Sequence, residues 1–330
     1  MNISKLRLFI ILGILIVCLG TILLYELHFL NIGHPVEAKA LEIKAGMSFD
    51  EVVDELKDVG VIDSKFVIKI YGLITGQASR IKPGRYVLSS NNSLPRLLGI
   101  LTEGPAEISV LIAPGMTLKE IDRKLSVMGI IEQNSLANLN VNSFKKNYPW
   151  LEDASSLEGF LFPDTYNFFS ASDVNLVVNK FLDNFEAKAL PFSGNGNNLL
   201  ETVSLASILE KEVPDYQERQ LVAGILIKRL NAGMPLQVDA SLIYGKCFGE
   251  FLNCPSLQEA DYKFDSPYNT YLYKGLPKTP ICNPDLDAIK AASSPKKSDY
   301  WYYLSDPETQ KTVFSRTLDE QNKNRAKYLH

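Results

Sequence analysis

The 330-residue sequence predicts an α+β fold that begins with a transmembrane helix and continues as two parts outside the membrane. Three observations predict it. Residues 8–25 form an uncharged apolar run, residues 43–63 recur at 112–132 as a strand, turn and helix, and from about residue 151 the composition shifts to loops rich in aromatic residues. Short strands and helices in mixed order favour an α+β architecture.

The first element is the apolar run at residues 8–25. Its 18 uncharged residues are about the minimum for a helix that crosses the ~30 Å hydrocarbon layer. Lys5 and Arg7 precede the run and Glu26 is the first charge after it, so the positive-inside rule places the N-terminus in the cytoplasm. A cleaved signal peptide is the alternative, but no small-x-small cleavage site follows the run. We therefore expect a single-pass anchor in the cytoplasmic (inner) membrane, with the body of the chain in the periplasm or outside. The expected boundaries are residues 1–7 cytoplasmic, 8–25 anchor and 26–40 linker.

An internal repeat forms the next elements. Residues 43–63 and 112–132 match at a constant offset of 69 residues. Each copy contains a short strand, a glycine turn, an N-cap at Ser48 or Thr117 with Glu three residues on, and an amphipathic helix that ends at a glycine. The sequence therefore predicts the same strand-turn-helix unit twice.

Between the two copies, residues 81–89 suit a strand and turn, and residues 93–101 suit a short helix. Units of this kind resemble the LysM type of peptidoglycan-binding module, and a plain scaffolding duplication is the alternative. We expect this LysM-like part to cover residues 41–150.

The remaining residues, 151–330, are expected to form a second α+β domain. Helices are predicted at 199–213, 215–232 and 285–292, and strands at 300–304 and 312–314. The second of these helices begins after Pro214 with Asp215 as N-cap and stops at Gly233. Loops rich in Tyr, Asn and Pro at 158–168, 236–245 and 266–284 suit a polysaccharide groove, because flat rings stack on sugar faces and amides bond hydroxyl groups.

The scarcity of histidine and cysteine excludes several kinds of active site. The three histidines, His28, His34 and His330, all lie near the ends of the chain, which argues against a Ser-His-Asp or Cys-His hydrolase and against an HExxH zinc peptidase. No P-loop or GxGxxG motif is present. The formal net charge of −4 argues against nucleic acid as a partner. The chemistry is expected to use carboxylates, amides and tyrosines, with no metal and no cofactor.

Outside the membrane, disulfides are permitted. Cys247 and Cys254 flank a short segment that could close as a small loop, which would leave Cys282 unpaired. Two free thiols are the alternative.

One predicted helix carries an acid in an apolar position. At 100° per residue, a helix over 198–213 places Glu210 near the middle of an apolar face. That face consists of Leu199, Val203, Ala206, Leu209 and Val213. The polar side chains expected on the opposite, solvated side are Glu201, Ser204, Lys211 and Glu212. A carboxyl group in apolar surroundings has a raised pKa and can hold the proton that a general acid donates. The alternatives are a buried Glu held by an Arg and an exposed edge of the apolar face.

Several long segments in register point to one family. They are ASILEKE at 206–212, EGFLFPDTY at 158–166, LQVDASLIYG at 236–245, SPYNTYLYKGLPKTPICNP at 266–284 and IKAASSPKKSDYWYYL at 289–304. Together they closely resemble the YceG-like (MltG) family of membrane-anchored endolytic murein transglycosylases, over roughly residues 41–330.

The resemblance implies a reaction and a set of site residues. Glu210, as the first Glu of the E-K-E segment, would be the catalytic acid. It would donate its proton to the glycosidic oxygen between N-acetylmuramic acid and N-acetylglucosamine, and the C6 hydroxyl would then attack to leave a 1,6-anhydro end without consuming water. The expected substrate-binding neighbours are Glu158, Tyr166, Gln237, Asp239, Tyr268, Asn269 and Tyr271. Peptidoglycan strands and cell-wall synthases in the same membrane are the expected partners.

Two other functions stay open on the sequence. One is a silent peptidoglycan-binding scaffold for wall synthases, and the other is a lysozyme-type hydrolase with Asp239 or Glu158 as its second carboxylate. About 17 residues separate Tyr25 from Ile43, so the tether reaches at most ~60 Å. We therefore expect cleavage of nascent strands close to the membrane, which would limit their length.

Overall fold

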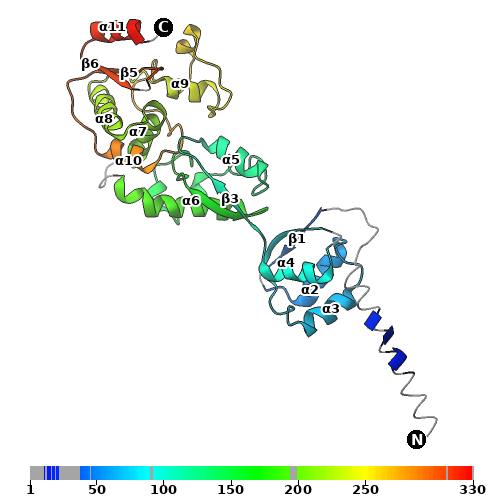
Figure 1. Cartoon of the computed structure of the whole chain (residues 1–330). Helices are drawn as coiled ribbons and strands as arrows, with labels where there is room; N and C mark the ends of the chain where they lie inside the picture. Colours follow the sequence, from blue (N-terminus) through cyan, green and yellow to red (C-terminus); the bar gives the residue numbers. More distant parts are fainter. Residues whose placement is uncertain are drawn as a thin grey trace, which may run out of the picture. The chain divides into compact units, whose positions relative to one another are not determined.

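The computed structural model describes residues 11–21 except 12, 16 and 19, and residues 38–328 except 45, 90, 91, 194–198 and 310. Much of the predicted anchor at 8–25 lies outside these residues. Among the helices that are described, none has the length and apolar character needed to cross a membrane. The chain divides into two compact units (Figure 1), the first running to Ile108 and including Phe168–Ser172, and the second comprising Ser109–Asn167 and everything from Asp173 onward.

The first unit contains a two-stranded sheet and three helices. Its elements are β1 (Ala38–Ile43), α2 (Phe49–Asp58), α3 (Lys65–Ile74), β2 (Gly84–Ser89) and α4 (Leu94–Glu103). The strands are antiparallel, with Ala38 opposite Ser89 and Ile43 opposite Gly84. Side chains from both strands and from all three helices meet in one apolar core. The strand expected within 81–89 and the helix expected at 93–101 are both confirmed.

The first copy of the repeat is β1, a turn and α2. The Ser48 hydroxyl accepts a hydrogen bond from the Glu51 N–H, and the Glu51 carboxylate accepts one from the Ser48 N–H at 2.7 Å, which completes the predicted capping box. Val52, Val53 and Leu56 lie on the buried face of α2. The amphipathic pattern of the sequence therefore identifies the face that packs on the core.

The second unit is built from helices and short ribbons. Its elements are β3 (Glu107–Leu111), α5 (Leu118–Val127), η1 (Val141–Ser143), η2 (Pro149–Leu151), β4 (Thr165–Phe169), α6 (Val174–Lys188), η3 (Leu190–Phe192), α7 (Leu199–Glu212), α8 (Tyr216–Asn231), α9 (Asp239–Lys246), η4 (Glu259–Lys263), α10 (Leu286–Ser293), β5 (Tyr302–Ser305), β6 (Thr312–Ser315) and α11 (Leu318–Tyr328). Two-stranded sheets pair β3 with β4 and β5 with β6, and the division between the units falls within β3 and β4. The fold is α+β, as the sequence predicts.

The second copy of the repeat belongs to the second unit. Its helix α5 carries the predicted capping box between Thr117 and Glu120. Two hydrogen bonds join the turn before α5 to the loop before α10: the Gly115 N–H donates to the Asn283 carbonyl, and the Asn283 N–H donates to the Met116 carbonyl, both at 2.9 Å. Because this copy is tied to residues far along the chain, the compact units divide at Ile108, whereas the domain boundary expected from the sequence is residue 150.

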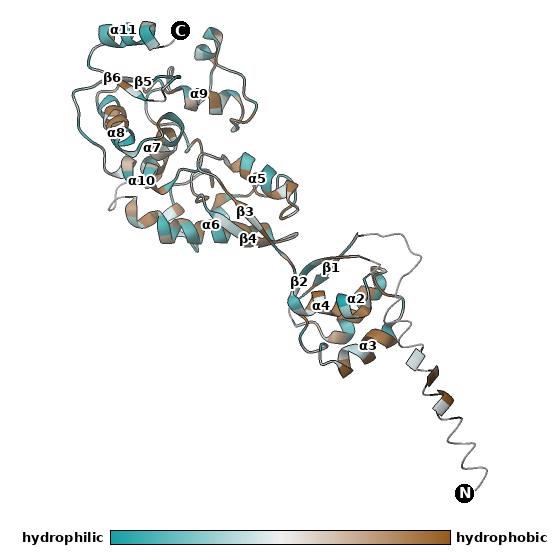
Figure 2. Cartoon of the chain, in the orientation of Figure 1, coloured by the Kyte–Doolittle hydropathy of each residue, from teal (hydrophilic) through white to brown (hydrophobic). Residues whose placement is uncertain are grey.

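Helix α7 is the central helix of the second unit. It packs against α8, α9 and α10, of which α8 and α10 lie beside it in Figure 1, and every residue from Val203 to Leu209 is buried. The apolar middle of α8, brown in Figure 2, supplies part of this packing. Of the four residues of the predicted solvated face of α7, only Glu201 is exposed: Ser204 is buried, and Lys211 and Glu212 are half-buried. Helices on several sides of α7 leave little of it for water.

Candidate active site

The last turn of α7 carries two glutamates, Glu210 and Glu212. Two residues along a helix correspond to a rotation of about 200°, so the two side chains point to different sides of α7. Their environments differ in the charges that they face.

Glu210 lies in a buried ion pair. Its Oε1 is 3.3 Å from Nη2 of Arg219, and its Oε2 accepts a hydrogen bond from the Asp285 N–H at 2.9 Å. The side chains of Glu210 and Arg219 are 8% and 6% exposed. Nη1 of Arg219 also contacts Asp285 Oδ1 at 2.8 Å. The arrangement matches the alternative that the sequence leaves open, a buried Glu held by an Arg.

Opposing effects act on the proton affinity of Glu210. Burial raises its pKa above the ordinary value, and the negative charge of the Asp285 carboxylate adds to that rise. The Asp285 N–H and the positive charge of Arg219 act against the rise, but the pKa of Glu210 is raised on balance.

Glu212 is a half-buried carboxyl group without a cation. Burial, reinforced by the negative charge of Asp239, raises its pKa to about 7. Interactions with the Ala240 N–H and the Tyr303 hydroxyl lower the pKa in part. Among the residues that the structure describes, no Lys or Arg forms an ion pair with Glu212. Near neutral pH, a large share of the Glu212 population therefore carries a proton.

Asp239 and Tyr271, both predicted from the sequence, lie beside Glu212. Asp239 is exposed at the first residue of α9, and its Oδ1 accepts a 2.6 Å hydrogen bond from the Tyr271 hydroxyl. Gln237, also predicted, is exposed two residues earlier in the chain. Its N–H donates to the Thr270 carbonyl at 3.1 Å, which ties the 236–245 loop to the 266–284 loop. Asp239 and Tyr271 thus lie on the side of α7 that Glu212 faces, and Gln237 lies in the loop that precedes Asp239.

Asn269 takes part indirectly. Its side chain is buried, donates to the Tyr262 and Phe264 carbonyls and accepts a hydrogen bond from the Tyr271 N–H. It therefore fixes the loop that presents Tyr271. The Tyr271 ring also meets Tyr262 edge to face, with 4.8 Å between centroids.

Two further predicted residues lie in other parts of the unit. Glu158 is fully enclosed, accepts hydrogen bonds from the Leu118 N–H, the Tyr244 hydroxyl and the Asn283 amide, and has a pKa that burial raises to about 8. Tyr166 is buried and donates to the Phe162 carbonyl at 2.6 Å. Tyr166 is an interior residue, and Glu158, although buried, lies in the wall of a cavity of about 480 Å³.

Tyr268, the last of the predicted residues, lies at a separate cavity. Its ring meets Tyr244 edge to face at 4.8 Å between centroids, and both rings line a cavity of about 480 Å³. Within the described residues, no cluster of three or more His, Cys, Asp or Glu side chains is arranged to hold a metal ion.

Tyr303 and Arg219 are site residues that the sequence analysis did not single out. Tyr303 lies in the segment at 289–304 that carries the family resemblance, so a signal for it was present. Arg219 has no such signal, because its partners Glu210 and Asp285 are 9 and 66 residues away.

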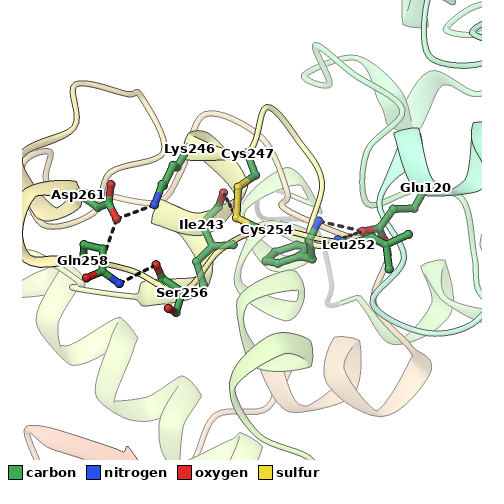
Figure 3. The surroundings of a disulfide bond; sticks show 10 residues. Glu120, Ile243, Lys246, Cys247, Leu252, Cys254, Ser256, Gln258 and Asp261 are labelled. Atoms are coloured by element: carbon green, nitrogen blue, oxygen red, sulfur yellow. Dashed lines mark hydrogen bonds and ion pairs between the residues drawn. A yellow bond between two sulfur atoms is a disulfide. The ribbon is translucent and has the colours of Figure 1, made fainter.

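Cys247 and Cys254 form the predicted disulfide, and Cys282 is free and buried. Figure 3 shows the loop that this disulfide closes. Glu120 of α5 lies on one side of the loop, and the ion pair of Lys246 with Asp261 lies on the other. The Glu120 carboxylate accepts hydrogen bonds from the backbone N–H groups of residues 251 and 252 at 2.8 and 3.0 Å. The loop is therefore fixed to α5 as well as closed on itself.

Comparison with known proteins agrees with this architecture. The chain is 29% identical over 311 residues to an endolytic murein transglycosylase of Bacillus subtilis, covering 88% of this chain and 84% of that protein. It is 26% identical over 320 residues to an endolytic murein transglycosylase of Streptococcus pneumoniae D39, covering 87% of this chain but only 58% of the longer relative.

A solved structure and a family model extend the comparison. The crystal structure of a putative yceG-like protein from Listeria monocytogenes matches with a TM-score of 0.55 and 27% identity, covering 88% of this chain and 100% of that one. The model of the YceG-like family matches residues 41–327. Because that match covers well over half of the chain, this protein belongs to the YceG-like family.

Proposed function

We propose that this protein is a lytic transglycosylase that cleaves peptidoglycan and that Glu212 is its proton donor. The relatives named endolytic murein transglycosylases, which match most of this chain, support the reaction class. The observation that carries the residue is a carboxyl group with a pKa raised to about 7, beside Tyr303 and beside the exposed Asp239, which accepts a hydrogen bond from Tyr271.

Glu212 suits the donor role better than Glu210, the residue that the sequence indicates. A general acid must hold a proton at the working pH and reach the leaving oxygen. Glu210 faces both the Arg219 cation, which opposes its protonation, and the Asp285 carboxylate, which favours it. Glu212 faces the Asp239 carboxylate, forms no ion pair among the described residues, and has in Asp239 a neighbour that is open to solvent. We assign Glu210 to holding α7, α8 and α10 together.

The proposed reaction needs one proton-carrying group. Glu212 donates its proton to the glycosidic oxygen between N-acetylmuramic acid and N-acetylglucosamine, and the C1–O bond breaks as positive charge develops at C1. The C6 hydroxyl oxygen of the same muramic acid forms a new bond to C1, and its proton passes to the Glu212 carboxylate. The product is a 1,6-anhydro end, Glu212 is protonated again, and water is not consumed. We assign to Asp239, which accepts a hydrogen bond from Tyr271, the role of stabilising the developing cation with its charge.

Product analysis tests the proposed reaction. Purified murein sacculi digested with the protein should release fragments that end in 1,6-anhydromuramic acid. Reducing ends would instead indicate a hydrolase that activates water, with Asp239 as the second carboxylate, and the enclosure of Glu158 argues against its taking that role. Absence of new ends would indicate a scaffold. Either result would overturn the proposed reaction.

We also propose that residues 8–25 anchor the protein in the cytoplasmic membrane and that the anchored enzyme shortens nascent strands. The uncharged run behind Lys5 and Arg7 supports the anchor, and the short tether before Ile43 supports action near the membrane. Nearby cell-wall synthases, which produce those strands, would then be its neighbours. Cells without the protein should carry longer glycan strands. A form released from its anchor should restore normal lengths poorly at equal abundance, and full restoration would refute the positional role.

A further inference from the structure

The second unit holds a cavity that the proposed reaction does not use, and one residue at its mouth stands out. Phe248 lines this cavity of about 480 Å³, and the residue is 77% exposed. Its φ angle is +54°, in the left-handed region, because Phe248 follows the C-cap of α9: its N–H donates to the Gly245 carbonyl, and the Gly249 N–H donates to the Tyr244 carbonyl. Glycine is the usual residue at this position of a helix end. The helix end explains the backbone conformation but not the exposed aromatic ring at the mouth of a cavity.

The surrounding contacts hold the Phe248 backbone in place. Nζ of Lys119 donates to the Phe248 carbonyl at 2.7 Å, and the disulfide begins at the preceding residue, Cys247. Farther along the same loop, Glu120 binds two backbone N–H groups and Arg123 pairs with Glu250. These contacts from α5 keep the loop from relaxing, so the ring stays at the mouth of the cavity.

Two glycines let the walls of the cavity come close together. A Cβ atom at Gly245 would lie 2.5 Å from Oγ of Ser266, which is too close for any other residue without a shift. Gly249 has a φ angle of +86°, and a Cβ there would lie 3.4 Å from the Tyr244 hydroxyl oxygen. Glycine at both positions therefore keeps the loop against Tyr244 and the Ser266 segment.

The lining combines flat rings with polar groups. Phe248, Phe264 and Tyr268 supply the rings. The polar residues at the cavity are Lys119, Glu158, Asp265 and Ser266. Ring faces beside hydrogen-bonding groups suit a pyranose, which has an apolar C–H face and a rim of hydroxyl groups.

The loop that lines this cavity also reaches the proposed active site. Asn269 binds the Phe264 carbonyl on the cavity side and accepts from the Tyr271 N–H on the Glu212 side. One short segment thus connects both places.

We propose that this cavity is a second glycan-binding site, in which one sugar ring of the strand stacks on Phe248 while another part of the strand lies at Glu212. The proposal rests on the proposed function for its ligand. Phe248 acts there as a binding residue that contacts sugar and takes no part in the chemistry.

The test titrates the full chain with a tetramer of N-acetylglucosamine and measures the binding affinity by calorimetry. This probe contains no muramic acid and so no bond of the kind that the proposed reaction cleaves. Phe248→Ala should weaken binding roughly tenfold, because the stacking contact is lost. Leu252→Ala is the matched control: Leu252 lies in the same loop, is 57% exposed and does not line the cavity. It should bind as the unmodified chain does, and Phe248→Trp should retain binding.

Phe248→Gly separates binding from folding. Glycine adopts a positive φ without strain, so this variant should bind as weakly as Phe248→Ala while its melting temperature stays the same or rises. A Phe248 that served only to pack the loop would lower the melting temperature when removed. Equal affinity of Phe248→Ala and Leu252→Ala, or no binding of the tetramer to the unmodified chain, would overturn the second site. Neither result bears on the ends released from sacculi, so the proposed reaction stands or fails separately.

Discussion

At the C-terminal turn of α7, a separation of two residues decides which charge a carboxyl group faces. Glu210 is turned toward Arg219, and Glu212 is turned toward Asp239 and Tyr303. The sequence singles out Glu210 because it interrupts an apolar face. It gives no such signal for Glu212, whose burial depends on α9 and β5, segments that lie 27 or more residues farther along the chain.

Removal of Arg219 should destabilise the second unit strongly. Arg219→Ala leaves Glu210 without its cation in a covered position, and loss of one partner of a buried pair costs about 3–5 kcal/mol. The free energy of unfolding can be measured in urea through tryptophan fluorescence, because Trp150 and Trp301 both lie in the second unit.

Lys188→Ala is the control for this measurement. Lys188 pairs with Asp164 in the same unit, but its side chain is 49% exposed, so its removal should cost only about 0–1 kcal/mol. Equal effects of the two substitutions would show that the Glu210 pair is not a structural one.

The pH dependence of cleavage should follow the Glu212 carboxyl group. The pKa of Glu212 is raised to about 7, so the carboxyl group loses the proton that it donates as the pH rises above that value. Above the pKa, kcat should fall about tenfold for each pH unit. Initial rates between pH 5 and 9 measure this. A rate that stays constant up to pH 9 would point to a different donor.

The same shift in pKa affects stability, and the sign is fixed. The folded chain binds the Glu212 proton more tightly than the unfolded chain, so the free energy of unfolding decreases as the pH rises from the ordinary value of 4.5 to about 7. Glu158, with its pKa raised to about 8, contributes a decrease of the same sign. The free energy of unfolding is therefore measured against pH for the unmodified chain and for Glu212→Gln. The difference between the two slopes is the contribution of Glu212, which the Gln variant lacks.

At the scale of elements, the two copies of the repeat share a cap but differ in what the cap does next. In α2, Glu51 closes the capping box with Ser48. In α5, Glu120 closes the same box with one carboxylate oxygen and binds the backbone of the disulfide loop with the other. The same motif thus caps the N-terminus of the helix in both copies. In the second copy its glutamate also holds the disulfide loop.

This difference predicts unequal effects of one substitution. Glu120→Ala should accelerate amide hydrogen exchange both in the first turn of α5 and at Phe251 and Leu252. Glu51→Ala, the matched change in the first copy, should accelerate exchange in the first turn of α2 alone. If the amides of Phe251 and Leu252 exchange equally fast in the two variants, Glu120 does not anchor the loop.

At the scale of the whole molecule, local signals are predictable and distant contacts are not. The sequence places the helices at 199–213 and 215–232 within a residue of α7 and α8, because Asp215, Pro214 and Gly233 mark their ends. The compact units, however, divide at Ile108, because Asn283 binds residues near 116 and 159–161. A contact that spans more than 100 residues leaves no trace in local periodicity.

The candidate site follows the same rule. Gln237, Asp239 and Tyr271 could be named from loop composition and family resemblance, and the structure brings Asp239 and Tyr271 to the side of α7 that Glu212 faces. The burial of Glu158 and Tyr166 could not be foreseen, because a Glu or Tyr in a loop has the same sequence pattern whether it is exposed or buried.

The central claim is that Glu212, and not Glu210, donates the proton. The most direct test compares Glu212→Gln with Glu210→Gln in the full chain, measuring the release of 1,6-anhydro fragments from murein sacculi after circular dichroism confirms that both variants are folded. Glu212→Gln should lose at least ~100-fold in rate, because the amide keeps the shape of the side chain but carries no acidic proton. Glu210→Gln should retain most of its activity per folded molecule and lose stability instead. Near-normal release by Glu212→Gln, together with loss of cleavage in a well-folded Glu210→Gln, would contradict the account and return the role to Glu210.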